Sequence, residues 1–139
     1  MIELLVAILL FAFGLLGMIG MQSKALGYGH MSLLRSQAAA LTDDMMDRLR
    51  SDRANALAGN WQITMGETAS DVVGSTLAAN DQRDWLTQVA ALLPSGQASV
   101  SVSLTGGVTI AIQWYEQGND PPGTTTPTTF TSFTTTSRL

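Results

Sequence analysis

The first part of the chain is almost entirely apolar. Between Glu3 and Lys24, the twenty residues from Leu4 to Ser23 carry no charge. As a helix this stretch is about 30 Å long, the thickness of the hydrocarbon layer of a bilayer. We therefore predict a membrane-spanning helix. A cleaved signal peptide is the alternative reading, but it favours a basic start, a shorter apolar stretch and a small-residue cleavage site.

Apolar side chains continue beyond Lys24 at the spacing of one helix face. They recur at intervals of three, four or seven residues, with polar residues on the opposite face, which is typical of an amphipathic helix. The stripe consists of Tyr28, Met31, Leu34, Ala38, Leu41, Met45, Leu49 and Ala56. We therefore predict one helix from about Ile2 to Leu57, with Gly59 as its C-terminal stop.

A second, shorter helix follows after a loop. Residues 58–80 mix Gly, Thr, Ser and Asp without a sustained period and predict a connecting loop. The segment 81–93 has apolar residues on one side, with Asn80 or Asp81 as N-cap and the sequence PSG as a stop.

The last third of the chain has the pattern of an antiparallel sheet. Strict alternation of apolar and polar residues predicts strands over about 97–104 and 108–115, joined by a turn at Gly106 and Gly107. The face predicted to be buried consists of Ala98, Val100, Val102, Leu104, Val108, Ile110, Ile112 and Trp114. Residues 118–127 predict a loop, and the Thr-rich segment at about 128–137 predicts a third strand, with a low-complexity tail over 124–139 as the alternative.

These elements predict an α+β fold with the layout of a lollipop. The buried face of the sheet needs a partner, and the apolar stripe of the long helix is the large apolar surface available to it. We expect two parts, an apolar half-helix over 1–27 and a globular domain over 28–139 that contains the helix 28–57 and all later elements.

Charge and composition exclude several classes of function. The chain has eleven acidic and seven basic residues, with a net charge of -4, and no basic patch. This distribution does not fit a nucleic-acid partner. Because cysteine is absent, disulfides, thiolate chemistry and cysteine-ligated metals are excluded. No Gly-rich loop follows a strand and opens a helix, so a nucleotide site is not indicated, and we expect no cofactor.

Candidate catalytic residues are few. The sequence DDMMD at 43–47 has the spacing of a magnesium-diphosphate motif, but a metal site needs several convergent ligands. We expect instead that its acids form local ion pairs with Arg48, Arg50 or Arg53 on a solvated helix face. His30 is the only histidine, and it indicates no catalytic triad. Trp61, Trp85 and Trp114 could form an exposed binding platform, but two of them, Trp85 and Trp114, lie on predicted apolar faces and are expected in the core. We therefore expect a protein that is not an enzyme and has no metal site.

Five glycines interrupt the predicted long helix: Gly14, Gly17, Gly20, Gly27 and Gly29. Each costs a helix up to about 1 kcal/mol relative to alanine. Small residues allow another helix to approach closely within lipid, and near the membrane surface they permit local unwinding. The alternative is that glycine is simply common in membrane helices.

The sequence IELLVA at Ile2 to Ala7 resembles the N-terminal region of type IV pilins, in which a glutamate lies in an otherwise apolar helix. More closely, the run LLVAILLFAFGLLGMIGMQ, the amphipathic half-helix, the QW pair at Gln113 and the Thr-rich end SRL are similar to minor pilins of the PilV type. The specific part of the resemblance covers about the first fifty residues. Pseudopilins of type II secretion share the same N-terminal features.

The resemblance implies a structural role in pilus assembly. Glu3 would pair with the N-terminal amine of a neighbouring subunit, and the adjacent Leu4, Leu5 and Val6, with Gly14, Gly17 and Gly20, would form the packing surface between subunits. The implied partners are other minor pilins, the major pilin, the inner-membrane assembly machinery and, before assembly, membrane lipid. The implied location is the bacterial inner membrane with the globular domain in the periplasm, and then the pilus, where the subunit would prime or cap the filament.

Alternatives to this role stay open, both for the whole chain and for Glu3, and the chain departs from the family pattern at one point. The chain could be a secretion pseudopilin, or a single-span membrane protein whose periplasmic domain binds a partner. Glu3 could also lie close enough to the interface to stay hydrated without a specific role. Family members carry a basic leader ending in Gly, usually followed by Phe and Thr before the Ile-Glu pair, whereas here Met1 directly precedes Ile2. We therefore expect either a natural start further upstream or a chain that is not processed in the usual way.

Overall fold

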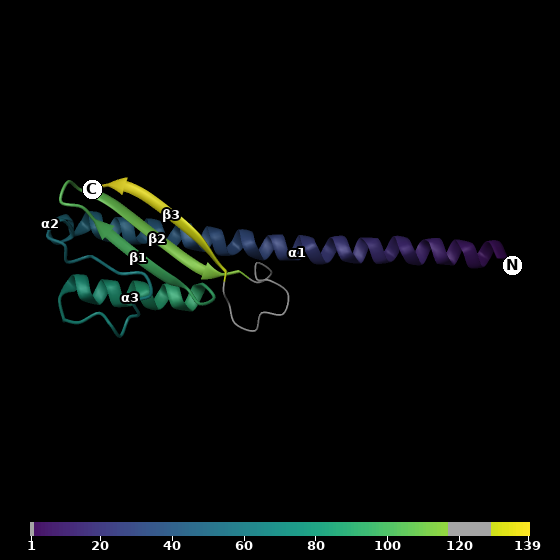
Figure 1. The fold of residues 1–139 in the computed structure, drawn as a ribbon, viewed down its shortest axis with the longest axis horizontal. Coiled ribbons are helices and arrows are strands. Elements are labelled where there is room, and N and C mark those ends of the chain that lie inside the picture. The colour runs from purple at the N-terminus through teal and green to yellow at the C-terminus, as the bar shows by residue number, and fades with distance from the viewer. Residues whose placement is uncertain (1, 117–128) are drawn as a thin grey trace. The chain divides into compact units, whose positions relative to one another are not determined.

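The computed structural model describes residues 2–116 and 129–139 and has the predicted α+β architecture. It contains a long N-terminal helix, a three-stranded antiparallel sheet and further short helices (Figure 1). The elements are α1 (Ile2–Ser51), α2 (Arg53–Leu57), α3 (Leu77–Leu92), β1 (Gln97–Val102), β2 (Gly107–Tyr115) and β3 (Phe130–Arg138). The expected loop at 118–127 and the expected first residue of the third strand, at 128, lie outside the described residues.

The chain divides into two compact units, Met1–Leu33 and Leu34–Leu139. The sequence pattern placed this division at 27 and 28, because the apolar stripe begins at Tyr28. In the structure Tyr28 is 68% exposed, and Leu34 is the first described residue of α1 that is buried. The stripe is therefore buried from Leu34 onwards, through Ala38, Leu41, Met45 and Leu49.

The prediction of one helix as far as Leu57 is wrong at one residue. Asp52 separates α1 from α2, with φ of -119° and ψ of 46°. Its carboxylate accepts hydrogen bonds from Asn55 Nδ2 at 2.8 Å and from Trp61 Nε1 at 3.2 Å. A short polar side chain that bonds locally in this way competes with the helical backbone. Gly59 follows with φ of +86°, a left-handed conformation that suits the end of a helix.

The shorter helix begins earlier than the sequence predicted. Its N-cap is Thr76, whose hydroxyl accepts a hydrogen bond from the Ala79 N–H at 3.2 Å, and neither Asn80 nor Asp81 caps the helix. The helix therefore begins at Leu77 and not at 81. A threonine followed by the good helix formers Leu, Ala and Ala supplies both an N-cap and a first turn.

The sheet has the order β1-β2-β3, and both pairings are antiparallel. β1 pairs Val102 with Val108, while β2 pairs Ile112 with Phe133 of β3. The Thr-rich end is thus a strand over Phe130–Arg138, as the first of the two sequence readings expected. Threonine and phenylalanine favour the extended, half-buried conformation of a strand.

The hairpin between β1 and β2 turns earlier than the alternation predicted. β1 ends at Val102 instead of 104, and β2 begins at Gly107 instead of 108. Ser103 N–H donates to Gly107 O at 2.7 Å, and Gly106 N–H donates to Ser103 O at 2.9 Å with Gly106 at φ of +84°. A three-residue loop with a left-handed glycine at its end is a common hairpin connection. Leu104 lies in this loop and is 89% exposed, so the prediction that it is buried is wrong.

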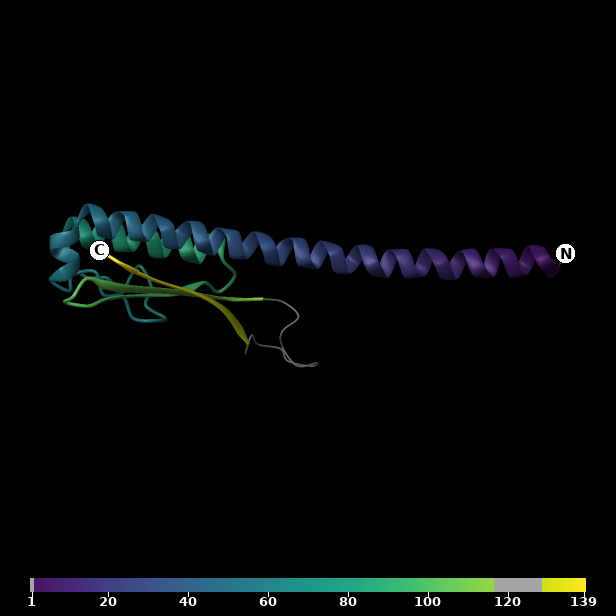
Figure 2. The same ribbon diagram turned by 90° about the horizontal axis from the view of Figure 1, so that it is seen from above.

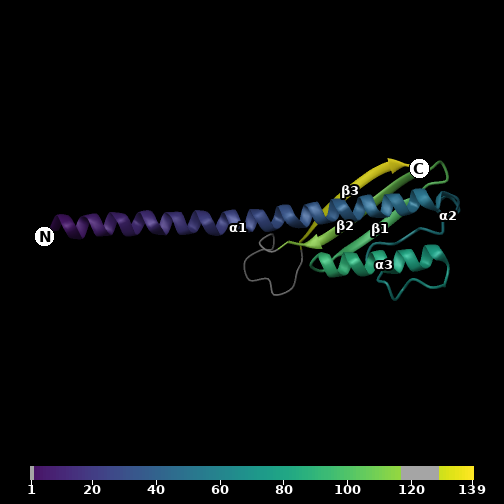
Figure 3. The same ribbon diagram turned by 180° about the vertical axis from the view of Figure 1, so that it is seen from behind.

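Within the unit Leu34–Leu139 the helices and the sheet form two layers. Figure 2 shows α3 and the C-terminal part of α1 on one face of the sheet, and Figure 3 shows the two helices side by side. Trp85 Nε1 of α3 donates to Leu41 O of α1 at 2.9 Å, within the buried core. The core includes Ile110, Ile112 and the other inward side chains of β1 and β2 that the alternation predicted, Leu104 excepted.

Candidate functional site: an exposed apolar helix

The unit Met1–Leu33 is helical throughout its described residues and exposes its apolar side chains to the surroundings. Large apolar residues occur on every face of the helix, and from Ile2 to Tyr28 their exposed fractions run from 46% at Leu15 to 78% at Leu26, while Met31 is half-buried. The helix is long and apolar enough to cross a membrane, as judged from its length and composition. So much contiguous apolar surface is unstable in water and indicates contact with lipid or with other protein.

The residues predicted to pack between subunits all lie on this helix. Leu4, Leu5 and Val6 are 66%, 67% and 49% exposed. Glu3 is exposed in the first turn of α1 and forms no ion pair or hydrogen bond with another described residue. The structure thus places these apolar residues and the Glu3 carboxylate on the same helix, and among the described residues Glu3 has no partner.

The glycines of this unit do not make room for another described part of the chain. A Cβ added at Gly14, Gly17 or Gly20 would meet no atom within 4 Å, apart from the local helix backbone. Packing within the described chain therefore does not require glycine at these positions. What their small size permits is the close approach of a neighbouring helix.

Two of the three acids at 43–47 form the local ion pairs that were expected on a helix face, whereas Asp43 forms none with a described residue. Asp44 accepts from Arg48 Nε at 2.9 Å, and Asp47 accepts from Arg50 at 3.2 Å. In the part of the chain that the structure describes, no group of three or more His, Cys, Asp or Glu side chains is placed to hold a metal ion. His30, on the apolar helix, is exposed.

All three tryptophans are fully buried, which confirms the prediction for Trp85 and Trp114 and adds Trp61 to the core. Trp61, Trp85 and Trp114 have relative exposures of 0%. Trp61 and Trp85 donate their indole N–H groups to Asp52 and to Leu41 O. A stacking platform for bases or sugars needs exposed rings, so the tryptophans do not form one.

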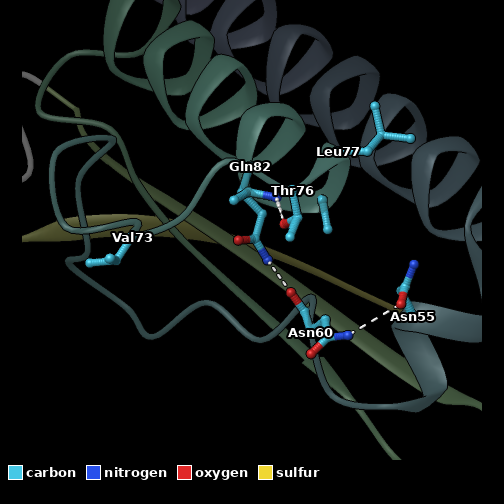
Figure 4. A pocket seen from close by; sticks show the side chains of 8 residues that line it. Asn55, Asn60, Val73, Thr76, Leu77 and Gln82 are labelled. Atoms are coloured by element: carbon cyan, nitrogen blue, oxygen red, sulfur yellow. Dashed lines mark hydrogen bonds between the residues drawn. The ribbon is translucent and has the colours of Figure 1, made fainter.

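A cavity of about 340 Å³ lies between α2 and the start of α3 (Figure 4). Its polar side chains already bind one another or the backbone. Gln82 Nε2 donates to Asn60 O at 3.0 Å, and Asn60 Nδ2 donates to Asn55 Oδ1 at 3.2 Å. These bonds stabilise the turn after α2. The amide side chains that line the cavity, Asn55, Asn60 and Gln82, are uncharged and do not form a set of acid, base and nucleophile.

One polar arrangement could not be found by sequence reasoning. Gln62 lies in the segment predicted as a loop, but its side chain donates to Val102 O at 2.7 Å and accepts from Val102 N–H at 3.4 Å. The neighbouring Ile63 exchanges two backbone hydrogen bonds of 3.0 Å with Val100. These contacts cover the outer edge of β1. Forty residues separate Gln62 from Val102, and no local pattern indicates such a pairing.

Comparison of the chain with protein-family models, with curated proteins and with solved structures finds no match.

Proposed function

We propose that this protein is a structural subunit of a type IV pilin-like filament, a minor pilin that is held in the inner membrane before assembly. In this role the globular unit lies in the periplasm, and α1 packs against the corresponding helices of other pilins when the subunit enters the filament. The subunit then primes or caps the filament. The role is structural, without a catalytic step.

The single observation that carries this proposal is the chemistry of the exposed helix. The sequence from Leu4 to Ser23 is uncharged, its large apolar side chains as far as Met21 are exposed on all sides, and one carboxylate precedes it at Glu3. A helix that only anchors a domain has no need of that carboxylate, because an unpaired charge within hydrocarbon costs several kcal/mol. A positively charged partner offsets the cost. An amine at the start of a neighbouring subunit would supply such a partner inside a bundle of apolar helices.

The glycines support the same proposal. Since a Cβ added at Gly14, Gly17 or Gly20 would meet no described atom within 4 Å beyond the local helix backbone, these glycines are available to contact a neighbour. Close contact between helices matters within lipid and within a filament core, because dispersion forces then replace the hydrophobic effect as the main attraction. A secretion pseudopilin would use the same surface, and the loss of an exported substrate rather than of surface fibres would identify that role.

The proposal is tested by replacing Glu3 with alanine in the native host. We expect Glu3→Ala to insert into the membrane fraction at the wild-type level but to be depleted at least about tenfold from filaments sheared off the cell surface, which corresponds to about 1.4 kcal/mol. Asp84→Ala is the matched control, because Asp84 is an exposed acid of α3. It should enter filaments normally.

Equal amounts of the Glu3→Ala and wild-type chains in the filament fraction would refute the pilin role. The single-span binding protein would then be the better description, since such a protein needs α1 only as an anchor.

A further inference from the structure

The two edges of the sheet differ in how their backbone groups are satisfied. At the β1 edge, Val100 exchanges two hydrogen bonds with Ile63, and both backbone polar groups of Val102 bond to the Gln62 side chain. The outer edge of β1 is thus closed over these residues by the segment before α3. Closing an edge in this way prevents the addition of a further strand.

Over residues 132–136 of β3, no other described residue covers the edge by hydrogen bonds in this way. Residues of an antiparallel strand alternate between bonding one neighbour and bonding the other. Ser103 bonds Gly107, and Leu139 N–H donates to Gly106 O at 2.9 Å. Leu139 is thus a residue that bonds the neighbouring segment on the β2 side, and by the alternation the other odd-numbered residues, within β3, also bond β2. The even-numbered residues Ser132, Thr134 and Thr136 therefore direct their N–H and C=O groups outward, away from β2. No hydrogen bond links these outward groups to another residue that the structure describes.

The features by which proteins usually protect an edge strand are also missing from β3. Its nine residues pair with β2 in continuous register, without a bulge, and contain no proline. Its one charged residue, Arg138, is the last of the strand. A long, regular and uncharged edge is a template for another strand.

Beside this edge, α1 and β3 line a groove of about 340 Å³. Thr135 and Ser137 line it from the strand, while Asp43, Asp47 and Arg50 line it from the helix. The inward β3 residues at this end are small hydroxyl residues, and a strand added beyond β3 would place alternate side chains next to them.

The charge of the groove indicates which side chain would enter it. Asp43 and Asp47 are four residues apart and therefore lie on the same face of α1, where like charges repel. Arg50 pairs with Asp47 at 3.2 Å, whereas Asp43 has no ion pair with any residue in the described ranges. The groove therefore keeps a negative charge that a lysine or arginine would neutralise.

We propose that the open edge of β3 binds an extended segment of a partner protein as a fourth strand, and that a lysine or arginine of this segment enters the groove beside Asp43 and Asp47. Recognition by strand addition uses main-chain hydrogen bonds for affinity and alternate side chains for specificity. The proposal concerns the globular unit alone. It applies equally to a filament subunit and to a membrane-anchored binding protein, so its failure would leave the proposed filament role untouched.

The test uses the full chain in detergent micelles and a fluorescent nine-residue peptide of alternating valine and threonine with lysine at its centre. Two matched peptides carry glutamate in place of the lysine, or N-methyl groups on alternate amides. Binding is measured by fluorescence anisotropy. We expect the lysine peptide to bind, the glutamate peptide to bind at least about fivefold more weakly and the N-methylated peptide not to bind.

Two pairs of variants locate the site. Thr134→Pro removes an outward N–H without removing a bond to β2, and should weaken the lysine peptide about tenfold or more. Thr134→Val keeps the N–H and should bind as the wild type does. Asp43→Asn combined with Asp47→Asn should abolish the preference for lysine over glutamate, while Asp84→Asn should preserve it. Melting curves followed by circular dichroism establish that each variant is folded.

Hydrogen exchange identifies the occupant of the edge. The lysine peptide should slow the exchange of the outward amides of Ser132, Thr134 and Thr136. The absence of binding, equal binding of the two charged peptides, or wild-type binding by Thr134→Pro would overturn the proposal. So would protection of the same amides without peptide that increases with protein concentration, because a second copy of the chain would then occupy the edge.

Discussion

Replacing Trp85 and Trp114 separately with phenylalanine should destabilise the globular unit to very different degrees. Both rings are fully buried, and both substitutions delete the same atoms. The loss of packing and the resulting cavity, about 1–2 kcal/mol for so few atoms, therefore largely cancel in the comparison. The difference that remains comes from the indole N–H groups.

The Trp85 N–H is bonded and the Trp114 N–H is not. Trp85 Nε1 donates to Leu41 O at 2.9 Å, a net contribution of about 0.5–1.5 kcal/mol. The Leu41 carbonyl lies inside α1 and keeps its intrahelical partner when Trp85 is replaced. Trp114 Nε1 is buried with no hydrogen-bond partner among the described residues, a state that costs about 1–3 kcal/mol. Trp114→Phe removes that cost.

We therefore expect Trp85→Phe to lower the free energy of unfolding by about 2 kcal/mol more than Trp114→Phe does. The measurement is urea denaturation of the full chain in detergent micelles, followed by circular dichroism, with the slope of the transition checked for constancy. Indole N–H exchange provides an independent observation, since the Trp85 proton should exchange only on unfolding. Equal losses within about 0.5 kcal/mol, or a greater loss for Trp114→Phe, would refute the assignment of the two N–H groups.

Three further changes test local features of the globular unit. Asp52→Ala removes the acceptor for Trp61 Nε1 and Asn55 and should cost about 1–2 kcal/mol of stability, measured as a lower urea midpoint. Gln62→Ala opens the β1 edge and should speed hydrogen exchange at the Val102 amide, with a loss of about 1 kcal/mol. The Thr68 hydroxyl and then its N–H, both donated to Asp71, lower the pKa of that carboxyl below its usual 3.8. Stability from this contact should be complete above pH 3.8 and decrease as the pH falls through the lowered pKa, and Asp71→Asn should remove this pH dependence. The titration can be followed by the NMR chemical shift of the Thr68 amide, and a midpoint at or above pH 3.8 would contradict the lowered pKa.

The layers of the fold could be predicted from the sequence because they depend on periodicity. Alternation over two strands and one helical stripe determine which faces meet, and the buried residues Ala98, Leu41 and Trp114 follow from that. The element ends were less predictable because they depend on side-chain bonds. Nothing in the apolar stripe indicates that Asp52 leaves the helix, and the cap at Thr76 competes with the plausible caps Asn80 and Asp81.

Of the two candidate sites, the sequence predicts the apolar helix but not the open edge of β3. The apolar surface and Glu3 can be identified from composition alone, because no residue outside the helix is needed to define them. The open β3 edge cannot, since its exposure depends on where a distant segment binds. Gln62 and Ile63 close β1 instead of β3, and the sequence of either strand gives no indication of that choice.

The threonines of β3 connect these observations. A strand that lies fully under a helix layer would carry apolar residues on its inward face, as β2 does with Val108, Ile110 and Ile112. The inward β3 residues Thr135 and Ser137 are only half-buried and line a polar groove beside α1. Their hydroxyl groups keep this face compatible with water in the free protein, while their small size leaves room for the side chains of an added strand. The composition that made this segment resemble a low-complexity tail is thus compatible with an ordered strand at the edge of the sheet, and with the strand addition proposed above.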